Sequence, residues 1–372
     1  MSADQPQPGG QPSSPILGGQ DARLPALRPY QAGDEAALTA LFAAAYGHTM
    51  SEALYRWKLT GLPSPTPNVW AAWEQDRPIF HYASIPTPYR TPDGPAILMT
   101  GADLMTTPDQ RRRGLLTAYA PQIYETWSQA GLPCTVGLPN ERWGSRADHL
   151  GWQPLLPLAW LIRPLRPEAL IARRLRLPLL ARAAIIGRLW QRRGRSRPPL
   201  GIEVQSVTQA DGRFDRLWQT AQPRQGYCVQ RDRRWVDWRF LSAPTAETRW
   251  RYHLLLAQRG DDPVGYLAYR VQAEAGRMTG FIADLFTAPA DEPARLALLA
   301  QALRVLYDLG AEKVATLALP TSPLYHSLAQ AGFRPALGAF TVRVRPLAQA
   351  LDLDTLRQPA SWYLTGSDFD VI

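Results

Sequence analysis

An arginine-rich loop joins an apolar strand-like run to a helix-like run in the first half of the chain. The strand-like run ADLMTTP (102–108) leads through this loop and Gly114 into a run with helical spacing of apolar residues. The first turn of a helix carries backbone N–H groups without partners and the positive end of the helix dipole. Glycine lets that backbone approach a ligand closely, because it has no Cβ atom. We therefore predict a pyrophosphate site at residues 111–116.

This loop differs from two other phosphate-binding loops. It lacks the GxxxxGK[ST] pattern, and it holds one glycine where a dinucleotide fingerprint needs three. The five histidines show no metal-ligand spacing such as HExxH, so no metal site is predicted. Cys134 lies in an apolar run, which favours a core position over a nucleophile.

The chain contains an internal repeat. GADLMTTP (101–108) recurs as IADLFTAP (282–289), and the same offset of 181 residues relates Trp57 to Trp238 and Gly151 to Gly332. We read two copies of one domain, residues 25–165 and 201–348.

Each copy has the same predicted order of elements: a helix, three strands, a helix, a short strand, a short helix and a last strand. β-branched and aromatic residues between turn signals indicate the strands, and apolar spacing indicates the helices. In the first copy the runs are 34–46, 68–74, 78–85, 96–105, 114–130, 134–139 and 159–165; in the second they are 211–221, 252–258, 264–271, 278–286, 292–309, 314–320 and 340–347. This order predicts an α+β fold with helices packed on a mixed sheet.

Two segments carry a resemblance to a known superfamily. The run PDQRRRGLL (108–116) resembles motif A of the GNAT acyltransferases, [QR]xxGx[GA], although Leu116 departs from its last small residue. The run is similar to RRRGLL of the mycobacterial enhanced-intracellular-survival acetyltransferases, which also contain tandem GNAT-like domains. The segment 140–152 is similar to the superfamily pattern N-x6-Y-x3-G-[FW] through Asn140, Gly151 and Trp152.

The resemblance implies two tandem GNAT-like domains, each a mixed, mostly antiparallel sheet flanked by helices. It also implies direct transfer of an acyl group from acetyl-coenzyme A, or another acyl-coenzyme A, to an amine of a small molecule or amino sugar. Pantetheine would lie between the fourth and fifth strands, along the backbone of Leu104, Met105 and Thr106. The diphosphate would lie on the loop, whose residues are Arg111, Arg112, Arg113, Gly114, Leu115 and Leu116.

Three residues are candidates for catalysis. Asp103 could serve as a base, but Asp284 occupies the same place in the second copy, which favours a structural role. Asn140 could contact pantetheine or the acceptor, or cap a helix. His149 could be catalytic or a surface residue. The superfamily's frequent acid, a tyrosine, is replaced by Ala147, which leaves the acid open among Ser145, Asp148, Tyr119 and His149.

The second copy has lost the phosphate loop. Glu292 stands where the first copy has Arg111, and Arg295 stands where it has Gly114. Because acidic side chains at a helix start repel phosphate, we predict that this copy binds no coenzyme. The repeated pairs Trp57-Lys58 and Trp238-Arg239 are interpreted as core tryptophans followed by solvated cations, with an acceptor cleft as the alternative.

The basic charge is concentrated in one segment. Residues 163–197 hold eleven of the 41 basic residues and one of the 32 acidic residues, which leaves 30 and 31 elsewhere. The predicted linker, 166–200, is basic and amphipathic. A linker packed on both domains is favoured over an anionic membrane surface, and a membrane over nucleic acid.

The remaining segments set the predicted context. Residues 1–24 read as a disordered tail and 349–372 as a C-terminal arm near the acceptor cleft. Two cysteines far apart and no apolar run of membrane-spanning length favour the cytoplasm, with peripheral membrane contact through the linker left open. Two alternatives to the acyltransferase remain. One is a Fem-like aminoacyltransferase that uses aminoacyl-tRNA, and the other is a non-catalytic coenzyme-binding or scaffold protein.

Overall fold

The structure is a computed structural model that describes residues 24–139, 143, 147–168, 201–244, 251–274, 276–348 and 351–369. The predicted tail up to residue 23 and most of the basic linker (169–200) lie outside the described residues, as does Asn140. The strands in the first half are β1 (Leu27–Pro29), β2 (Val69–Glu74), β3 (Arg77–Thr91), β4 (Gly94–Thr106), β5 (Cys134–Gly137) and β6 (Gln153–Pro164). Those in the second half are β7 (Glu203–Val207), β8 (Tyr227–Val229), β9 (His253–Arg259), β10 (Asp262–Glu274), β11 (Arg277–Thr287), β12 (Lys313–Ala318), β13 (Arg334–Pro346) and β14 (Trp362–Tyr363).

The helices of the first half are α1 (Glu35–Tyr46), α2 (Glu52–Thr60), α3 (Leu115–Gln129) and the short η1 (Pro108–Gln110). The second half holds α7 (Gly212–Ala221), α8 (Arg233–Val236), η3 (Asp237–Leu241), α9 (Glu292–Asp308) and α10 (Pro323–Gln330), followed by α11 (Leu353–Leu356), η5 (Pro359–Ser361) and η6 (Gly366–Asp368). The predicted strands and the two longer helices of each half occur in the predicted order, whereas β1, α2, β7, β8, α8 and η3 were not predicted. Ser51 caps α2 by accepting a hydrogen bond from the Leu54 amide at 3.1 Å.

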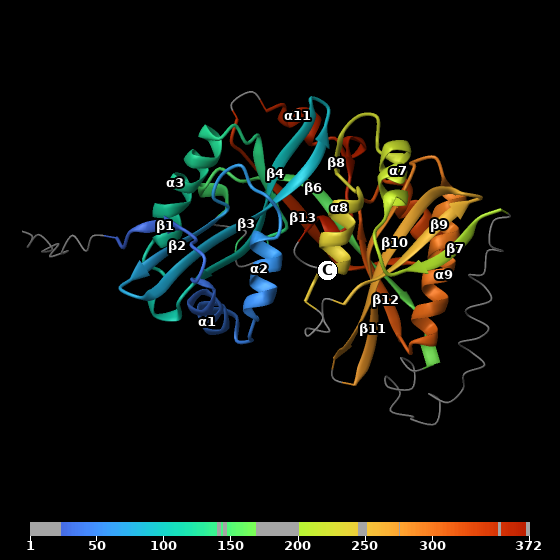
Figure 1. The fold of residues 1–372 in the computed structure, drawn as a ribbon, viewed down its shortest axis with the longest axis horizontal. Coiled ribbons are helices and arrows are strands. Elements are labelled where there is room, and N and C mark those ends of the chain that lie inside the picture. Colours follow the sequence, from blue (N-terminus) through green and yellow to red (C-terminus); the bar gives the residue numbers. More distant parts are fainter. Residues whose placement is uncertain are drawn as a thin grey trace, which may run out of the picture.

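The two halves exchange their last strands. The described strands form one sheet in the order β1-β2-β3-β4-β5-β13-β6-β12-β11-β10-β9-β7, with β8 and β14 off this path. Strand β13 of the second half therefore pairs with β5 of the first, and β6 of the first half pairs with β12 of the second. Figure 1 shows the halves side by side with β6 and β13 between them. The exchange makes the two repeats one structural unit.

A pair of tryptophans marks the local twofold relation between the halves. The Trp57 indole N–H donates to the Trp238 carbonyl at 2.7 Å, and the Trp238 indole N–H donates to the Trp57 carbonyl at 3.0 Å. The rings stack with centroids 5.5 Å apart. This confirms that the tryptophans pack in the interior, and shows that they join the two halves rather than filling separate cores.

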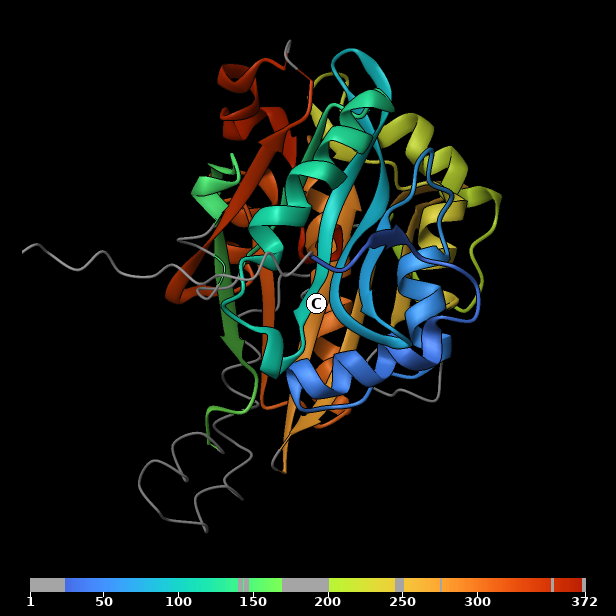
Figure 2. The ribbon, with the colours of Figure 1, turned by 90° about the vertical axis from the view of Figure 1, so that its left-hand side faces the viewer.

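Helices cover both faces of the first half's sheet. Leu115, Tyr119 and Ile123 of α3 pack in a cluster with Phe80 of β3 on one face. Helices α1 and α2 pack on the other face in a cluster that also contains residues of the second half, such as Trp235. Figure 2 looks onto this half, with α3 lying along the strands and α1 and α2 on their other side. The layers leave the junction between β4 and α3 at an edge of the half.

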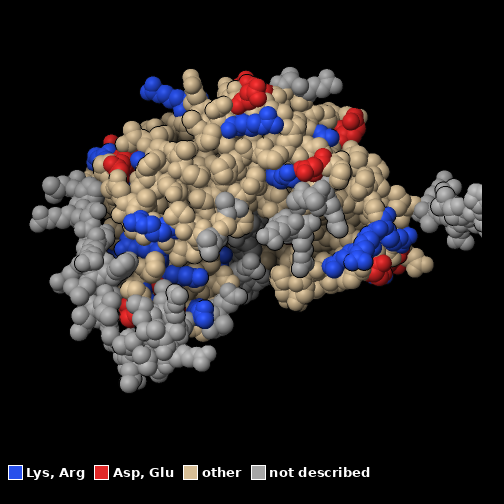
Figure 3. Space-filling model, turned by 180° about the vertical axis from the view of Figure 1, so that it is seen from behind, with Lys and Arg blue, Asp and Glu red and all other residues tan. Residues whose placement is uncertain are grey.

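Basic side chains of the described residues are spread over the surface. On the face in Figure 3, some Lys and Arg side chains lie beside an acidic side chain, and others lie without one. Among the described residues, no helix is long and apolar enough to cross a membrane.

Candidate functional site

Strands β4 and β5 separate soon after they meet. They pair in parallel at Met99 with Thr135 and at Thr100 with Val136, while β4 continues to Thr106. The other edge of β5 is occupied by β13. We call the opening beyond Thr100 and Val136 the first wedge. Its β4 side is the stretch 101–106, which includes the three residues predicted to line the pantetheine.

A bulge shapes that stretch of β4. Asp103 has a φ of 40°, a conformation that costs energy for a residue other than glycine. His81 holds it there, because its Nδ1 lies 2.7 Å from the Asp103 carbonyl and its Nε2 lies 3.0 Å from the Tyr55 hydroxyl. Burial lowers the pKa of His81, so the ring is neutral, donates to the carbonyl and accepts from Tyr55. This support for the bulge was not predicted from sequence.

The Asp103 carboxylate is buried in an ion pair. Lys58 Nζ lies 2.8 Å from Asp103 Oδ2, and the side chains are 5% and 9% exposed. The prediction that Lys58 is a solvated cation was therefore wrong: helix α2 turns it inward onto the bulge. Arg239, its counterpart in the second half, is also buried and donates to the Ser367 and Phe369 carbonyls. The pair compensates the charge of Asp103, which stays a candidate base beside the wedge.

The predicted phosphate loop forms an open turn at the start of α3. Gly114 is the N-cap residue, with a φ of 76°, and a Cβ atom added there would meet nothing within 4 Å. No side chain caps this helix start, so its first N–H groups face the opening. Arg112 also has a positive φ, of 67°. Residues 111–114 are exposed, and Leu115 is buried beneath them.

The arginines of the loop have different neighbours. Arg111 donates to the Ala45 carbonyl at 3.1 Å, which ties the loop to the end of α1. Arg113 bonds Gln110 and lies 3.7 Å from Glu74, an exposed pair of small energetic weight. Arg112 is exposed at the crest of the turn. The turn can therefore offer guanidinium groups and backbone amides to an anion together.

The matching helix start in the second half is closed by its own side chains. Asp291 caps α9 by accepting a hydrogen bond from the Ala294 amide at 3.1 Å. Arg295, in the place of Gly114, is buried and donates to Ser327, Thr287 and the carbonyls of Ala288 and Pro289. Its side chain is held inside the protein by these bonds, whereas Gly114 is exposed. The structure thus gives a physical reason for the predicted loss of coenzyme binding.

The chain's C-terminal segment fills the wedge between β11 and β12. Thr365 forms a bridge with Ala318 of β12, and the Tyr363 hydroxyl donates to the Leu285 carbonyl of β11. In the same region, Arg231 Nε lies 3.0 Å from Asp284 Oδ2, and Arg231 Nη2 lies 2.7 Å from Asp368 Oδ1. All three side chains are fully buried. The described part of the predicted C-terminal arm therefore packs into the second half, and residues 370–372 lie outside the described residues.

The turn after β5 holds the other catalytic candidates. Ala147 is fully buried. Asp148 is paired with Arg343 at 2.5 Å, and His149 is exposed next to it. Tyr119 is buried with its hydroxyl on the Pro25 carbonyl at 2.6 Å, so it cannot act in the wedge. Asn140 and Ser145 lie outside the described residues.

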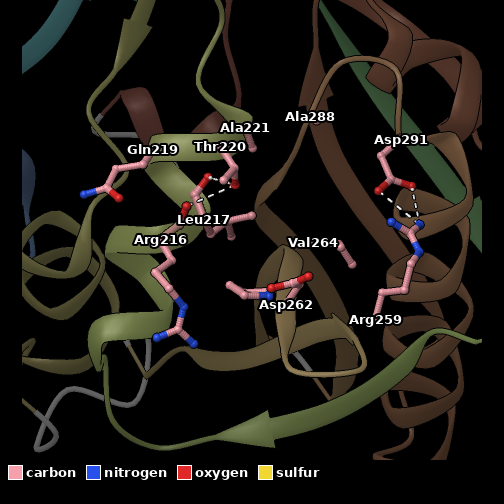
Figure 4. A pocket seen from close by; sticks show the side chains of 11 residues that line it. Arg216, Leu217, Gln219, Thr220, Ala221, Arg259, Asp262, Val264, Ala288 and Asp291 are labelled. Atoms are coloured by element: carbon pink, nitrogen blue, oxygen red, sulfur yellow. Dashed lines mark hydrogen bonds and ion pairs between the residues drawn. The ribbon is translucent and has the colours of Figure 1, made fainter.

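One cavity of the second half lies away from the wedge. A cavity of about 470 Å³ lies in the second half between α7, the β9–β10 turn and the loop before α9. Figure 4 shows its rim, where Arg259 pairs with Asp291 at 3.3 Å. Among the described residues, no group of three or more His, Cys, Asp or Glu side chains is placed to hold a metal ion. Burial raises the pKa of Cys134 to about 12, as expected for a core thiol.

Solved structures described as GCN5-related N-acetyltransferases superpose on most of this chain. The chain has the GNAT fold. A GCN5-related N-acetyltransferase from Anabaena variabilis superposes with a TM-score of 0.61 at 12% identity, covering 87% of this chain and 73% of that one. Eis1 from Mycobacterium abscessus superposes at 0.56 with 16% identity, covering 87% and 74%. A probable N-acyltransferase from Enterococcus faecalis reaches 0.63 at 10% identity, covering 87% and 72%. No protein-family model matches this chain, and no curated protein sequence matches it either.

Proposed function

We propose that this protein is an acyl-coenzyme A-dependent N-acyltransferase with one coenzyme site, in its first half. The acyl donor is acetyl-coenzyme A or a related thioester, and the acceptor is an amine on a small molecule or amino sugar. The observation that carries this proposal is the contrast between two equivalent helix starts. The start of α3 has no side-chain cap and is open at Gly114, whereas the start of α9 is capped by the Asp291 carboxylate.

The residues of the first half fit such a thioester along one path. The diphosphate would contact the amides at the start of α3 and the Arg112 guanidinium. Pantetheine would run from there along Thr106, Met105 and Leu104, whose β5-facing edge lies beyond the last described pair between β4 and β5. This direction brings the thioester to the bulge at Asp103. When bound, the thioester supplies an acyl carbon open to attack by an amine.

The protein's own contribution is positioning and proton transfer. His81 and Tyr55 hold the bulge from below, and Lys58 fixes the Asp103 carboxylate beside it. Preorganised backbone groups at a bulge can orient a carbonyl for attack without further rearrangement. Asp103 could receive the amine proton through water, while Lys58 holds it in place.

Calorimetry with acetyl-coenzyme A tests the site directly. The wild-type chain should bind at one site, and Arg112→Glu should weaken binding by about ten- to a hundredfold, because it reverses a charge within a few ångströms of the diphosphate. Arg277→Glu is the matched control: it makes the same charge change at an exposed arginine in the second half. If both variants bind acetyl-coenzyme A equally well, the diphosphate does not lie on this loop.

Turnover is then measured with a panel of primary amines, including amino sugars and polyamines, by following release of the free thiol. Acyl transfer to at least one amine is the expected result. Tight coenzyme binding without transfer to any amine would contradict the enzymatic assignment.

A further inference from the structure

Three aromatic side chains meet on the strands between the two halves (Figure 1). Trp160 of β6 and Phe340 of β13 pack edge to face, with ring centroids 5.9 Å apart. Phe281 of β11 lies on the Trp160 ring, at 6.3 Å between centroids, and the Arg270 guanidinium lies over Phe281 at 4.4 Å. We call Trp160, Phe281 and Phe340 the aromatic cluster.

The aromatic cluster reaches the surface of the protein. Phe340 is 38% exposed, and Trp160 and Phe281 are partly buried. A single exposed apolar side chain is ordinary on a protein surface, but an exposed ring that extends a cluster of rings offers a contact surface. Such a surface suits the apolar part of a ligand.

The strand register places Phe340 at the mouth of the first wedge. Thr100 of β4 and Val344 of β13 both pair with Val136 of β5. From these pairs, β4 continues to Leu104 and β13 leads back to Phe340, each four residues away. Because β4 is parallel and β13 antiparallel to β5, both run in the same direction, for about 13 Å. Leu104, next to the bulge, and Phe340 therefore flank the opening at about the same height.

The aromatic cluster and the Asp103 carboxylate lie on one face of the sheet. Phe340 is directly opposite Leu158 on the neighbouring strand, so their side chains share a face. Leu158 belongs to the same core cluster as Leu59 of α2, the helix that carries Lys58 to Asp103. An amine that approaches the bulge on this face therefore has the aromatic cluster beside it.

The aromatic cluster has no counterpart at the second wedge. At the repeat offset, Phe281, Trp160 and Phe340 correspond to Thr100, Thr341 and Ala159. Since none of these three is aromatic, the shared fold does not require rings at these places. The rings occur beside the wedge that is open, which favours a role in binding.

The charges around the aromatic cluster disfavour an acceptor with several amino groups. Strands β6, β11 and β13 hold one acidic residue, Asp284, and it is buried against Arg231. The same strands hold five arginines: Arg163, Arg277, Arg334, Arg343 and Arg345. On the other side of the wedge, Lys58 compensates the charge of Asp103. A polycation would approach a surface of its own sign.

We propose that the acceptor is a monoamine with an apolar ring, and that the aromatic cluster binds this ring while the amino group reaches the thioester beside Asp103. This inference rests on the proposed function and narrows its acceptor. Packing on Phe340 and Trp160 removes the ring of the acceptor from water. Apolar surroundings also favour the neutral form of an amine, which is the form that attacks the acyl carbon.

The test compares phenylbutylamine, with the ring and the amino group at opposite ends of the chain, and butylamine, which lacks the ring. With acetyl-coenzyme A, kcat/KM of the wild type should be at least about tenfold higher for phenylbutylamine, because burial of the ring adds to binding. Spermidine and glucosamine should be poorer acceptors than phenylbutylamine. Phe340→Ala should lower kcat/KM for phenylbutylamine by about tenfold and leave kcat/KM for butylamine unchanged.

Two further variants sharpen the test. Leu309→Ala is the control, because it removes an exposed apolar side chain at the end of α9, a helix that packs in a different core cluster from Leu158. It should keep the preference for phenylbutylamine. Phe340→Glu should raise kcat/KM for spermidine and lower it for phenylbutylamine, since it places a carboxylate at the mouth of the wedge. All three variants should bind acetyl-coenzyme A as the wild type does, by calorimetry.

The possible failures are distinguishable. If the wild type acetylates phenylbutylamine no faster than butylamine or spermidine, the proposed acceptor class is wrong, while the proposed function stands. If Phe340→Ala slows transfer to phenylbutylamine and butylamine equally, Phe340 is a structural residue and the aromatic cluster does not bind the acceptor. A wild-type chain that acylates no amine overturns the proposed function and this inference together.

Discussion

Two glycines of helix α3 allow the proposed diphosphate site to be tested with a matched pair of variants. Gly114 precedes the helix and Gly131 follows it, and each has a φ of 76° with nothing within 4 Å of an added Cβ atom. In both Gly114→Ala and Gly131→Ala the methyl group enters open space, so backbone strain is the main cost to folding. For an L-residue in the left-handed region this cost is about 1–2 kcal/mol. The two variants should therefore lose similar stability.

Binding should separate them. A methyl group at Gly114 stands where the diphosphate approaches the amides of α3, whereas Gly131 lies at the opposite end of the helix. We expect Gly114→Ala to weaken acetyl-coenzyme A binding at least about tenfold, which corresponds to about 1.4 kcal/mol. Gly131→Ala should bind as the wild type does.

The assay combines urea unfolding without ligand and calorimetry with acetyl-coenzyme A. Similar unfolding free energies with a binding loss confined to Gly114→Ala would support the site. If Gly114→Ala binds as tightly as Gly131→Ala, the diphosphate does not contact this turn, and the argument from the two helix starts fails.

Three other predictions concern the second half and the junction. Arg231→Met leaves Asp284 and Asp368 buried without a counter-charge, so the free energy of unfolding should fall by about 3–5 kcal/mol in urea unfolding. Adding Asp284→Asn and Asp368→Asn should restore most of this loss. A small loss in the single variant would contradict the prediction. Burial, with Asp284 nearby, raises the pKa of Asp368 to about 6. Its protonated form therefore stabilises the fold fully below the ordinary carboxyl pKa, and this stabilisation is lost as pH rises through about 6. Unfolding measured from pH 4 to 7 should therefore favour Asp368→Asn over wild type increasingly as pH rises, and a constant difference would refute the shift. Trp57→Ala and Trp238→Ala should be non-additive by about 0.5–3 kcal/mol in a double-mutant cycle, because each indole donates to the other's backbone; additive losses would argue against the junction.

Much of the fold could be predicted because the chain repeats itself. A motif such as ADLMTTP indicates a strand only weakly, but its recurrence 181 residues later ties the elements around it to the same order. The open turn before α3 was also predictable, since arginines followed by a glycine at a helix start combine charge, backbone amides and close access for an anion. The predicted helix 114–130 matches α3 (Leu115–Gln129) closely.

The strand exchange could not be predicted in this way. The last strands of the two copies, β6 and β13, are both apolar and run into Arg-Pro-Leu. Local pattern predicts that each is a strand, but the neighbour it pairs with is decided by contacts far away in sequence. In the structure β6 leaves its own half to pair with β12, and only the three-dimensional arrangement shows it.

Lys58 shows the same limit at the site itself. Lysine is rarely buried, so its residue type alone favoured a place in solvent. The partner that makes burial tolerable, Asp103, lies far along the chain and is aimed by a bulge that depends on His81 from another strand. Each of these contacts joins residues that are far apart in the sequence, and none of them produces a recognisable pattern of neighbouring residues. The residues proposed to bind a diphosphate therefore follow one another in one short run, whereas the residues around Asp103 come from α2, β3 and β4. For this reason the buried pair of Lys58 and Asp103 was found only after the bulge and its neighbours had been placed.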